Sequence, residues 1–496
     1  MSVPFKKDPT EYNQRALLAT NVFDLLPDDH DYFIYEDILS QIDIAKVEKK
    51  YSILGQHAYH PRLITAILIY AYSQGIFSSR KIEEKCKKDL SFMYISHRNC
   101  PNFRVLSDFR KENYKFFLEC FRQSVMIAKS LGMVSLGHVS LDGSKFYANT
   151  SKHKAASYRR LKEQEAKLTK EIDELLKKAD RCDDAEDKIY HNGKGYELPE
   201  ELKIKEVRIA KIKKVKKELE DREKKASLKE DIKDSSQISY ADSQAKIMKN
   251  KGSFEYCYNG QISIDSKSQI IVGQRLSQNA NDKNELKPAL ADIEKNTGGL
   301  PDKMSLDSGY MASDNISTLK DLKVDGYIAT GKGEKESSPD NSKKIGKLNF
   351  SYDSQKDIFI CPAGHILKLK SIGKNRVYKS KDKVCAGCSY QKRCTAKRNN
   401  IPTIYTDERG IILAAMKEKM QKDSSKEIYR KRKIIVEPVF GQIKEGGFRR
   451  FSLRGFVKAG GEFSPVCAVS NFKKIVGKIK SEINCTLGAE LVPAVN

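Results

Sequence analysis

The sequence predicts a multidomain α/β protein, in which an all-helical domain precedes a mixed sheet with helices and two insertions interrupt that sheet. Three observations support this fold class. Residues 1–130 carry helix-start signals around apolar runs, and two short apolar strands end in Ser-Leu-Asp, at Asp142 and at Asp307. From Glu255 onward, apolar residues alternate with a period of two, which is typical of strands. A chain of 496 residues has room for about two to four domains.

The N-terminal residues 1–130 are expected to form a helical DNA-binding domain. Ser78 or Ser79 opens one helix, with Glu83 as its capping-box partner, and another helix follows Pro101. Short helices with basic residues at their starts suit a helix-turn-helix that sets its last helix against DNA. An ordinary helical bundle with a basic surface fits the same pattern, so both interpretations stay open.

The predicted sheet core comprises residues 131–152 and 236–334, with its first strand at 136–147. Between these two parts, residues 153–235 form a charged insertion whose apolar residues recur at heptad-like steps, which is typical of an antiparallel helical hairpin. Its charges suit a solvated face, and a face that binds DNA or a partner is the alternative. The heptad-like positions are Leu161, Leu168, Ile172, Leu175, Ala179, Ile212, Val215 and Leu219.

The rest of the core is predicted to alternate strands and helices. Residues 255–265 and 269–276 read as a β-hairpin, followed by a helix, the Asp307 strand, a second helix and a strand at 326–330. This order predicts a mixed sheet with helices packed against it. Residues 335–400 form a second, cysteine-bearing insertion, and residues 401–496 form a helical C-terminal part of the core.

The composition favours a polyanionic partner. Lys and Arg number 91 against 66 Asp and Glu, which gives a net charge of +25 spread over most of the chain. Nucleic acid is the usual partner of such a chain, although a merely basic protein has the same balance. The start lacks the apolar core of a signal peptide, and the longest apolar run, residues 64–72, is too short to span a bilayer. We therefore expect a cytoplasmic protein with no membrane partner.

Asp142 and Asp307 are candidate catalytic acids. Each ends an apolar run, and a glycine follows one or two residues later, at Gly143 and Gly309. A buried strand that delivers a carboxylate where a turn opens is how α/β sheets present catalytic acids. Much of the sequence between the two acids is the helical insertion, so we expect them on adjacent strands, close enough to share a metal ion.

Glu437 is the third candidate acid. It is a lone acid in a basic helical segment, and Lys433, Phe440 and Lys444 would share its face of a helix. Pro438 conflicts with an unbroken helix because it lacks the N–H that would bond residue 434. We therefore expect a kink or a new helix start here, and either would aim Glu437 into a cleft.

Three carboxylates suit phosphodiester chemistry. Two Mg²⁺ ions can activate an oxygen nucleophile and neutralise the leaving oxygen, and hard divalent ions prefer carboxylate oxygens. Lys444 would hold a phosphate near the metals. The simpler interpretation is that each acid caps a turn or lies on a helix surface. This interpretation explains a single acid better than it explains three acids that follow one another in strand, strand and helix contexts.

Three segments resemble the catalytic blocks of bacterial insertion-sequence transposases of the DDE type. They are Val-Ser-Leu-Asp-Gly-Ser-Lys at 139–145, Ser-Leu-Asp-Ser-Gly-Tyr at 305–310, and the stretch from Tyr429 to Lys444. The third block is the most specific, with Tyr, a basic residue, Glu and Lys at set spacings. Arg432 lies one residue further from the Glu than the basic residue does in many relatives, and Lys433 would restore the spacing.

The resemblance implies an RNase H-like core in which Asp142, Asp307 and Glu437 bind two Mg²⁺ (or Mn²⁺) ions. It implies strand cleavage by water and then strand transfer by the freed 3′-OH, in cut-and-paste transposition at the element's own ends. The partners would be double-stranded DNA and a second copy of the chain, in a homodimer. A nuclease that cuts without joining and an inactive DNA-binding regulator are the alternatives. The candidate DNA-binding residues are Lys444, Arg432, Lys433, Arg449, Arg450 and Arg454.

Four cysteines form a candidate zinc site. Cys385, Cys388 and Cys394 form a C-x₂-C-x₅-C run, and Cys361 lies upstream of them. Four soft ligands with one CxxC knuckle fit tetrahedral Zn²⁺ in a structural site, and His365 could replace one cysteine. Free thiols in a loop are the main alternative, and an iron–sulfur centre is a weaker one.

Overall fold

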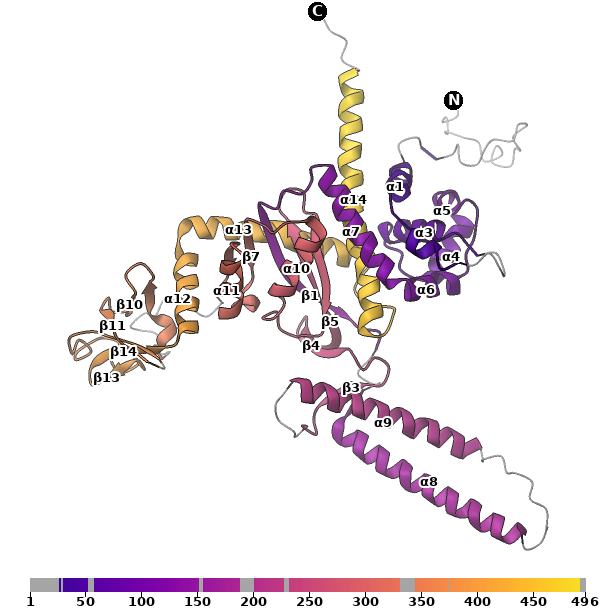
Figure 1. Ribbon diagram of the computed structural model, residues 1–496, viewed down its shortest axis with the longest axis horizontal. Helices are drawn as coiled ribbons and strands as arrows, with labels where there is room; N and C mark the ends of the chain where they lie inside the picture. The colour runs from indigo at the N-terminus through magenta and orange to yellow at the C-terminus, as the bar shows by residue number, and fades with distance from the viewer. Residues whose placement is uncertain are drawn as a thin grey trace, which may run out of the picture.

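The computed structural model in Figure 1 describes residues 26–27, 30–51, 58–150, 155–187, 200–226, 232–330, 344–373 and 375–490. The first 25 residues of the predicted helical domain lie outside these ranges. So does the predicted turn of the helical insertion, at Gly193, Gly195 and Pro199. In the described part of the chain, no helix is both long and apolar enough to cross a membrane.

The N-terminal part is helical, as predicted. Glu83 does not form the predicted capping box, because Ser78 occupies the N-cap without a side-chain hydrogen bond. The Glu83 carboxylate instead accepts a hydrogen bond of 2.9 Å from the Phe103 N–H, which ties one helix to the start of another. The helices are α1 (Asp31–Ser40), α2 (Ala45–Glu48), α3 (Pro61–Ser73), α4 (Ser79–Lys88), α5 (Leu90–Ile95), α6 (Phe103–Glu112) and α7 (Tyr114–Ser130).

The central sheet has the order β4-β5-β1-β7-β8, and β6 pairs with β5 as well. β1 runs antiparallel to β5 and parallel to β7, and β7 runs parallel to β8. This mixed sheet, with helices packed against it, confirms the predicted α/β fold class. Its elements are β1 (His138–Tyr147), β4 (Lys246–Asn250), β5 (Ser253–Asp265), β6 (Ile271–Ser277), α10 (Leu286–Thr297), β7 (Lys303–Leu306), η4 (Ser308–Tyr310), α11 (Ser313–Asp321) and β8 (Asp325–Ile328).

The first insertion is a pair of long helices that project from the sheet (Figure 1). The antiparallel strands β2 (Ala155–Ser157) and β3 (Gln237–Ser239) form its base, and α8 (Tyr158–Asp187) and α9 (Glu200–Ala226) form its arms. The arms have an apolar cluster of their own, separate from the main core. Five predicted heptad positions are buried in it, Leu161, Leu168, Ile212, Val215 and Leu219.

The second insertion is a small sheet with its own apolar core, in the order β13-β14-β12-β11-β10-β9. Its last strand ends at Thr406, so the expected boundary at residue 400 is corrected: the closing strand pairs with β12 and belongs to the insertion. The elements are η5 (Lys347–Asn349), β9 (Ser351–Asp353), β10 (Ile358–Ile360), β11 (Ile366–Ile372), β12 (Arg376–Lys379), β13 (Lys397–Arg398) and β14 (Ile401–Thr406).

Three helices complete the chain, α12 (Glu408–Gln421), α13 (Asp423–Glu445) and α14 (Phe456–Glu490). α14 packs against α7, α3 and α1 on one side and against β6 on another. Residues of the N-terminal helices and of the central sheet therefore share one apolar cluster. Burying this joint cluster fixes the helical domain against the core.

Lys474 on α14 is a half-buried amine whose titration should affect stability. Burial lowers the pKa of Lys474 to about 7, and its ammonium donates to the carbonyl of Gln269. The unfolded lysine titrates near ~10.4, so between about pH 7 and about pH 10 the unfolded state binds more protons, and stability rises with pH. Lys474→Met should therefore raise the Tm at neutral pH, and calorimetry should show the gain shrinking towards about pH 10. A gain that does not depend on pH would contradict this cause.

Candidate active site

Asp142 and Asp307 lie side by side on neighbouring strands. In the parallel pairing of β1 with β7, Leu141 is opposite Leu306, so each aspartate comes one residue after a paired position. Asp307 ends β7, as predicted, and its carboxylate accepts a hydrogen bond of 2.6 Å from the Gly309 N–H. The predicted adjacency of the two strands is confirmed.

Asp142 does not end its strand, contrary to the prediction. β1 continues to Tyr147, because β5 offers it an antiparallel partner as far as Cys257. Asp142 lies where β7 stops, so β1 loses its parallel neighbour at this residue. The edge of the sheet therefore opens beside Asp142 although the strand runs on.

Arg432 of α13 is the basic partner of Asp142. Its guanidinium lies 2.8 Å from the Asp142 carboxylate, and both side chains are largely buried. Burial, together with the nearby Asp307 and Asp282, raises the pKa of Asp142 to about 6, although Arg432 opposes the shift. Lys433, the alternative from the family spacing, is exposed. The structure therefore pairs Arg432, rather than Lys433, with the acid.

The helix that carries Glu437 passes through Pro438 without ending, so the expectation of a new helix start at this point, one of the two alternatives, is wrong. Pro438 cannot donate to the carbonyl of Ile434. The side chain of Gln269 donates to that carbonyl instead, at 2.7 Å, and so satisfies the acceptor that proline leaves free. The helix buries Val436 and Val439 and leaves Glu437 exposed rather than enclosed in a cleft.

Glu437 nevertheless shares the electrostatic surroundings of the two aspartates. Burial lowers the pKa of Arg432, but Asp142, Tyr429, Asp307 and Glu437 together raise it above its ordinary value. All three candidate acids therefore help to raise the pKa of this arginine. Its contact with Asp142 links the Glu437 helix to β1.

Lys444 is held on the same face of β1 as Asp142. Its ammonium donates to the Ser144 hydroxyl and lies 5.2 Å from the ring centre of Phe146, and these residues alternate with Asp142 along the strand. Burial lowers the pKa of Lys444. A partly desolvated cation at this place can bind a phosphate more strongly than a fully hydrated one.

The segment after α13 carries arginines along the end of β1. The Tyr147 N–H donates to the carbonyl of Arg449 at 3.1 Å, and the guanidinium of Arg450 lies 5.5 Å from the Tyr147 ring centre. Arg454 donates to the carbonyl of Asn149 at 3.2 Å. Arg449, Arg450 and Arg454 are exposed, and so a row of cations follows β1 away from Asp142.

Asp282 is a fourth acid at the site, and the sequence analysis missed it. Its carboxylate accepts hydrogen bonds of 2.6 Å from Asn259 and from Gln261, and the ammonium of Lys145 lies 3.7 Å away. It does not directly end an apolar strand but lies in the polar loop between β6 and α10. The only local signal in the sequence was an acid shortly after the β5–β6 hairpin. Acids at such positions are too common to identify a functional site.

The two motif glycines leave room for Asp282. A Cβ at Gly143 would overlap the Gln261 amide and lie 2.9 Å from the Asp282 carboxylate. A Cβ at Gly309 would lie 2.9 Å from Asp307 and 3.2 Å from Asp282. Glycine after each aspartate therefore lets the fourth acid approach both strand ends.

The donor set at this edge suits a hard divalent cation. Asp142 carries a raised pKa partly because like charges face it, and a bound cation would relieve that repulsion. Arg432 lies against the same carboxylate, at 2.8 Å. Across the described ranges, no group of three or more His, Cys, Asp or Glu side chains is arranged as a finished metal-ligand set.

The four candidate zinc ligands all lie in the second insertion, although the described residues hold no group of three or more His, Cys, Asp or Glu side chains arranged to hold a metal ion. Burial raises the pKa of Cys385, and Cys394, Cys388 and Cys361 raise it further, so all four thiols lie within electrostatic reach. The turn at Cys361 is closed by the N–H of His365, which donates to the Cys361 sulfur at 3.3 Å. All four are free thiols. Clustered soft donors in tight turns fit Zn²⁺.

The central sheet and its acids define a class of protein. Strands in the order β6-β5-β1-β7-β8, antiparallel on one side of β1 and parallel on the other, form an RNase H-like core. Two aspartates on its central strands and a glutamate-bearing helix packed on them match the catalytic blocks of DDE transposases.

Comparisons with known proteins agree with this class. The family described as "Transposase DDE domain" matches residues 360–476, and the family described as "Transposase domain (DUF772)" matches residues 20–112. The chain is a DNA transposase of the insertion-sequence DDE type. No curated protein matches it. Among solved structures it is similar to the cryo-EM structure of the piggyBac transposase synaptic complex with hairpin DNA, at 9% identity and a TM-score of 0.32, over 92% of this chain and 76% of that chain.

Proposed function

We propose that this transposase cuts and joins DNA strands at the ends of its own mobile element, in the cytoplasm, with Asp142, Asp307 and Glu437 as its catalytic acids. The observation that supports this most is the in-register placement of the two aspartates on β1 and β7. Arg432 contacts the Asp142 carboxylate, and Lys444 bonds to Ser144 two residues further along β1. Acids that bind cations, next to cations that bind phosphate, suit phosphoryl transfer.

In this proposal the three acids hold two Mg²⁺ (or Mn²⁺) ions. The ions would supply an activated water and neutralise charge on the leaving oxygen. Lys444 binds a phosphate beside the bond to be cut, and Arg432 keeps Asp142 ionised and oriented. Asp282 adds negative charge beside Asp142, and the absence of a side chain at Gly143 and Gly309 leaves room for it.

The proposed partners are double-stranded DNA and a second copy of the chain. Arg449, Arg450 and Arg454 line the path away from the acids and would contact phosphates of the element end. Lys433 is exposed one residue from Arg432 and would do the same. Because cut-and-paste transposition pairs two element ends, we expect a homodimer in the DNA complex.

A strand-transfer assay tests this function. Purified protein is incubated with labelled element-end DNA and a target plasmid, with Mg²⁺ or with EDTA. We expect joined products with Mg²⁺ and none with EDTA. Cleavage without joining would instead identify a nuclease, and binding without either reaction would contradict both enzymatic functions.

The second proposal is that Cys361, Cys385, Cys388 and Cys394 hold a structural Zn²⁺ ion. All four positions are filled by protein, so no coordination site stays open for water. The ion would connect the turn after β10 to the loop that precedes β13. The apolar core of this small sheet connects these two segments only in part.

Loss of zinc should loosen the second insertion alone. Cys385→Ser is expected to release the metal and to make residues 344–406 sensitive to protease, because a small sheet depends on such a staple. Metal analysis of the reduced protein should find about one zinc per chain. Cys100→Ser, in the N-terminal helices, serves as the control and should retain it. A metal-free wild-type protein would contradict the site.

A further inference from the structure

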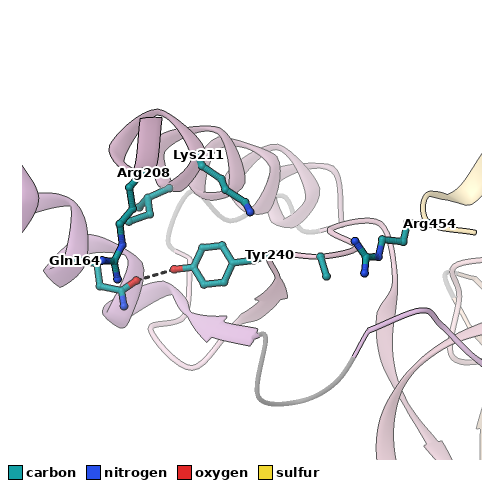
Figure 2. Close-up of a pocket in the computed structure, with 7 residues that line it drawn as sticks. Gln164, Arg208, Lys211, Tyr240 and Arg454 are labelled. Carbon is teal, nitrogen blue, oxygen red and sulfur yellow. Dashed lines mark hydrogen bonds between the residues drawn. The ribbon is translucent and has the colours of Figure 1, made fainter. Parts of the chain in front are cut away.

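A basic pocket lies between the helical insertion and the catalytic core. Its volume is about 530 Å³, and its walls come from α8, α9, the segment after β3 and the segment after α13. Figure 2 shows Arg208 beside Gln164 at one end, Lys211 above the ring of Tyr240 in the middle, and Arg454 at the other end. Residues far apart in the sequence thus form one concave surface.

The cations of this pocket are available to a ligand. Arg208, Lys211 and Arg454 are exposed, and none of them forms an ion pair with a carboxylate in the part of the chain that the structure describes. Other lysines of the same helix differ: Lys205 pairs with Glu171, and Lys216 pairs with Glu165. α9 therefore uses some cations to bind α8 and leaves the pocket cations free for an anion.

Tyr240 gives the pocket a fixed wall. Its hydroxyl donates to the side chain of Gln164 at 2.6 Å, which ties the segment after β3 to α8. Burial raises the pKa of Tyr240, and the nearby Arg160 and Arg208 oppose the shift. A neutral aromatic ring with a satisfied hydroxyl, flanked by guanidinium groups, suits a sugar or base beside a phosphate.

One wall of the pocket adjoins the end of the strand that carries Asp142. Arg454 bonds to the carbonyl of Asn149, two residues beyond the end of the strand that carries Asp142. A strand rises about 3.3 Å per residue, so Asp142 and Tyr147 lie about 17 Å apart, which is about five nucleotides along one DNA strand. Lys444, Arg449 and Arg450 occupy the interval.

We propose that this pocket binds the sugar–phosphate backbone of DNA several nucleotides from the bond that is cut, so that the helical insertion is a DNA clamp and not only a spacer. The proposal rests on the proposed function, since it takes the strand at Asp142 as its reference. Three cations that have no carboxylate partner among the described residues, in a pocket with an aromatic ring, match a polyanionic strand. A protein partner would need apolar contact area.

Charge reversal on two faces of α9 tests the clamp. Arg208→Glu with Lys211→Glu changes the pocket, and Lys213→Glu with Lys217→Glu makes the same change in charge on the opposite face of the helix, outside the pocket. Binding of a labelled 40-bp duplex is measured by fluorescence anisotropy in EDTA, at stepped salt concentrations, so that no cleavage enters the result.

We expect the pocket variant to bind at least ~10-fold more weakly, with a salt slope shallower by about two, because two phosphate contacts are lost. The control variant should retain the wild-type slope. Equal weakening in both variants would overturn the clamp. Arg208→Gln with Lys211→Gln repeats the test without new acids, and circular dichroism checks the fold of each variant. Failure of the wild type to cut DNA would count against the proposed function, not against this result.

Discussion

Asp307→Asn should abolish strand cleavage and strand joining and leave DNA binding intact. The amide keeps the shape of the side chain, and its oxygen can still accept from the Gly309 N–H, so the turn after β7 is preserved. It removes one of the two charges that would bind a cation between β1 and β7. Charge stabilisation at such a site is worth several kcal/mol, so we expect a rate loss of about 10³-fold or more.

The matched control for this prediction is Asp314→Asn. Asp314 is an exposed acid at the start of α11, away from the paired strand ends. Both variants are compared with wild type for cleavage, joining and duplex binding in the same buffer. Asp307→Asn with more than a tenth of the wild-type cleavage rate would exclude Asp307 from the reaction.

Asp282→Asn should raise the Mg²⁺ concentration needed for half-maximal cleavage by about tenfold. The Asp282 carboxylate raises the pKa of Asp142, so it adds negative potential at the catalytic edge. Loss of that charge weakens cation binding, and tenfold corresponds to about 1.4 kcal/mol. The amide still fills the space beside Gly143 and Gly309. If Asp282 acted only by positioning its neighbours and not through its charge, Asp282→Asn would lower the cleavage rate and leave its Mg²⁺ dependence unchanged.

Asp292→Asn is the control for Asp282. Asp292 lies on α10 and pairs with Arg275, at 3.6 Å, away from the two strand ends. Its loss should leave the Mg²⁺ dependence of cleavage as in wild type. An equal shift in both variants would show a general effect of net charge and would contradict the role assigned to Asp282.

Local patterns predicted much of the fold. Period-two alternation located β5 and β6, and heptad spacing located the arms of the helical insertion. The Ser-Leu-Asp strand ends led to the correct neighbours, β1 and β7. These features depend on the spacing of residues that are close together in the chain, and a single sequence shows that spacing directly.

The features that sequence reasoning missed depend on distant partners. Pro438 predicts a helix break, but Gln269 donates to the carbonyl that proline cannot bond. The strand that holds Asp142 continues past it because β5 extends beside it. The second insertion reaches Thr406 because β14 pairs with β12. Asp282 had no local motif, since its position depends on Asn259 and Gln261. Each of these contacts joins residues that lie apart in the chain.

The central claim is that Asp142, Asp307 and Glu437 bind the same divalent ions, and iron-mediated self-cleavage tests it most directly. Fe²⁺ replaces Mg²⁺, and ascorbate with peroxide then generates hydroxyl radicals that cut the polypeptide beside the bound metal. We expect cuts near residues 142, 307 and 437. Added Mg²⁺ should suppress these cuts, and all of them should be lost together in Asp307→Asn. Cuts that map elsewhere, or that persist in that variant, would contradict a shared metal site.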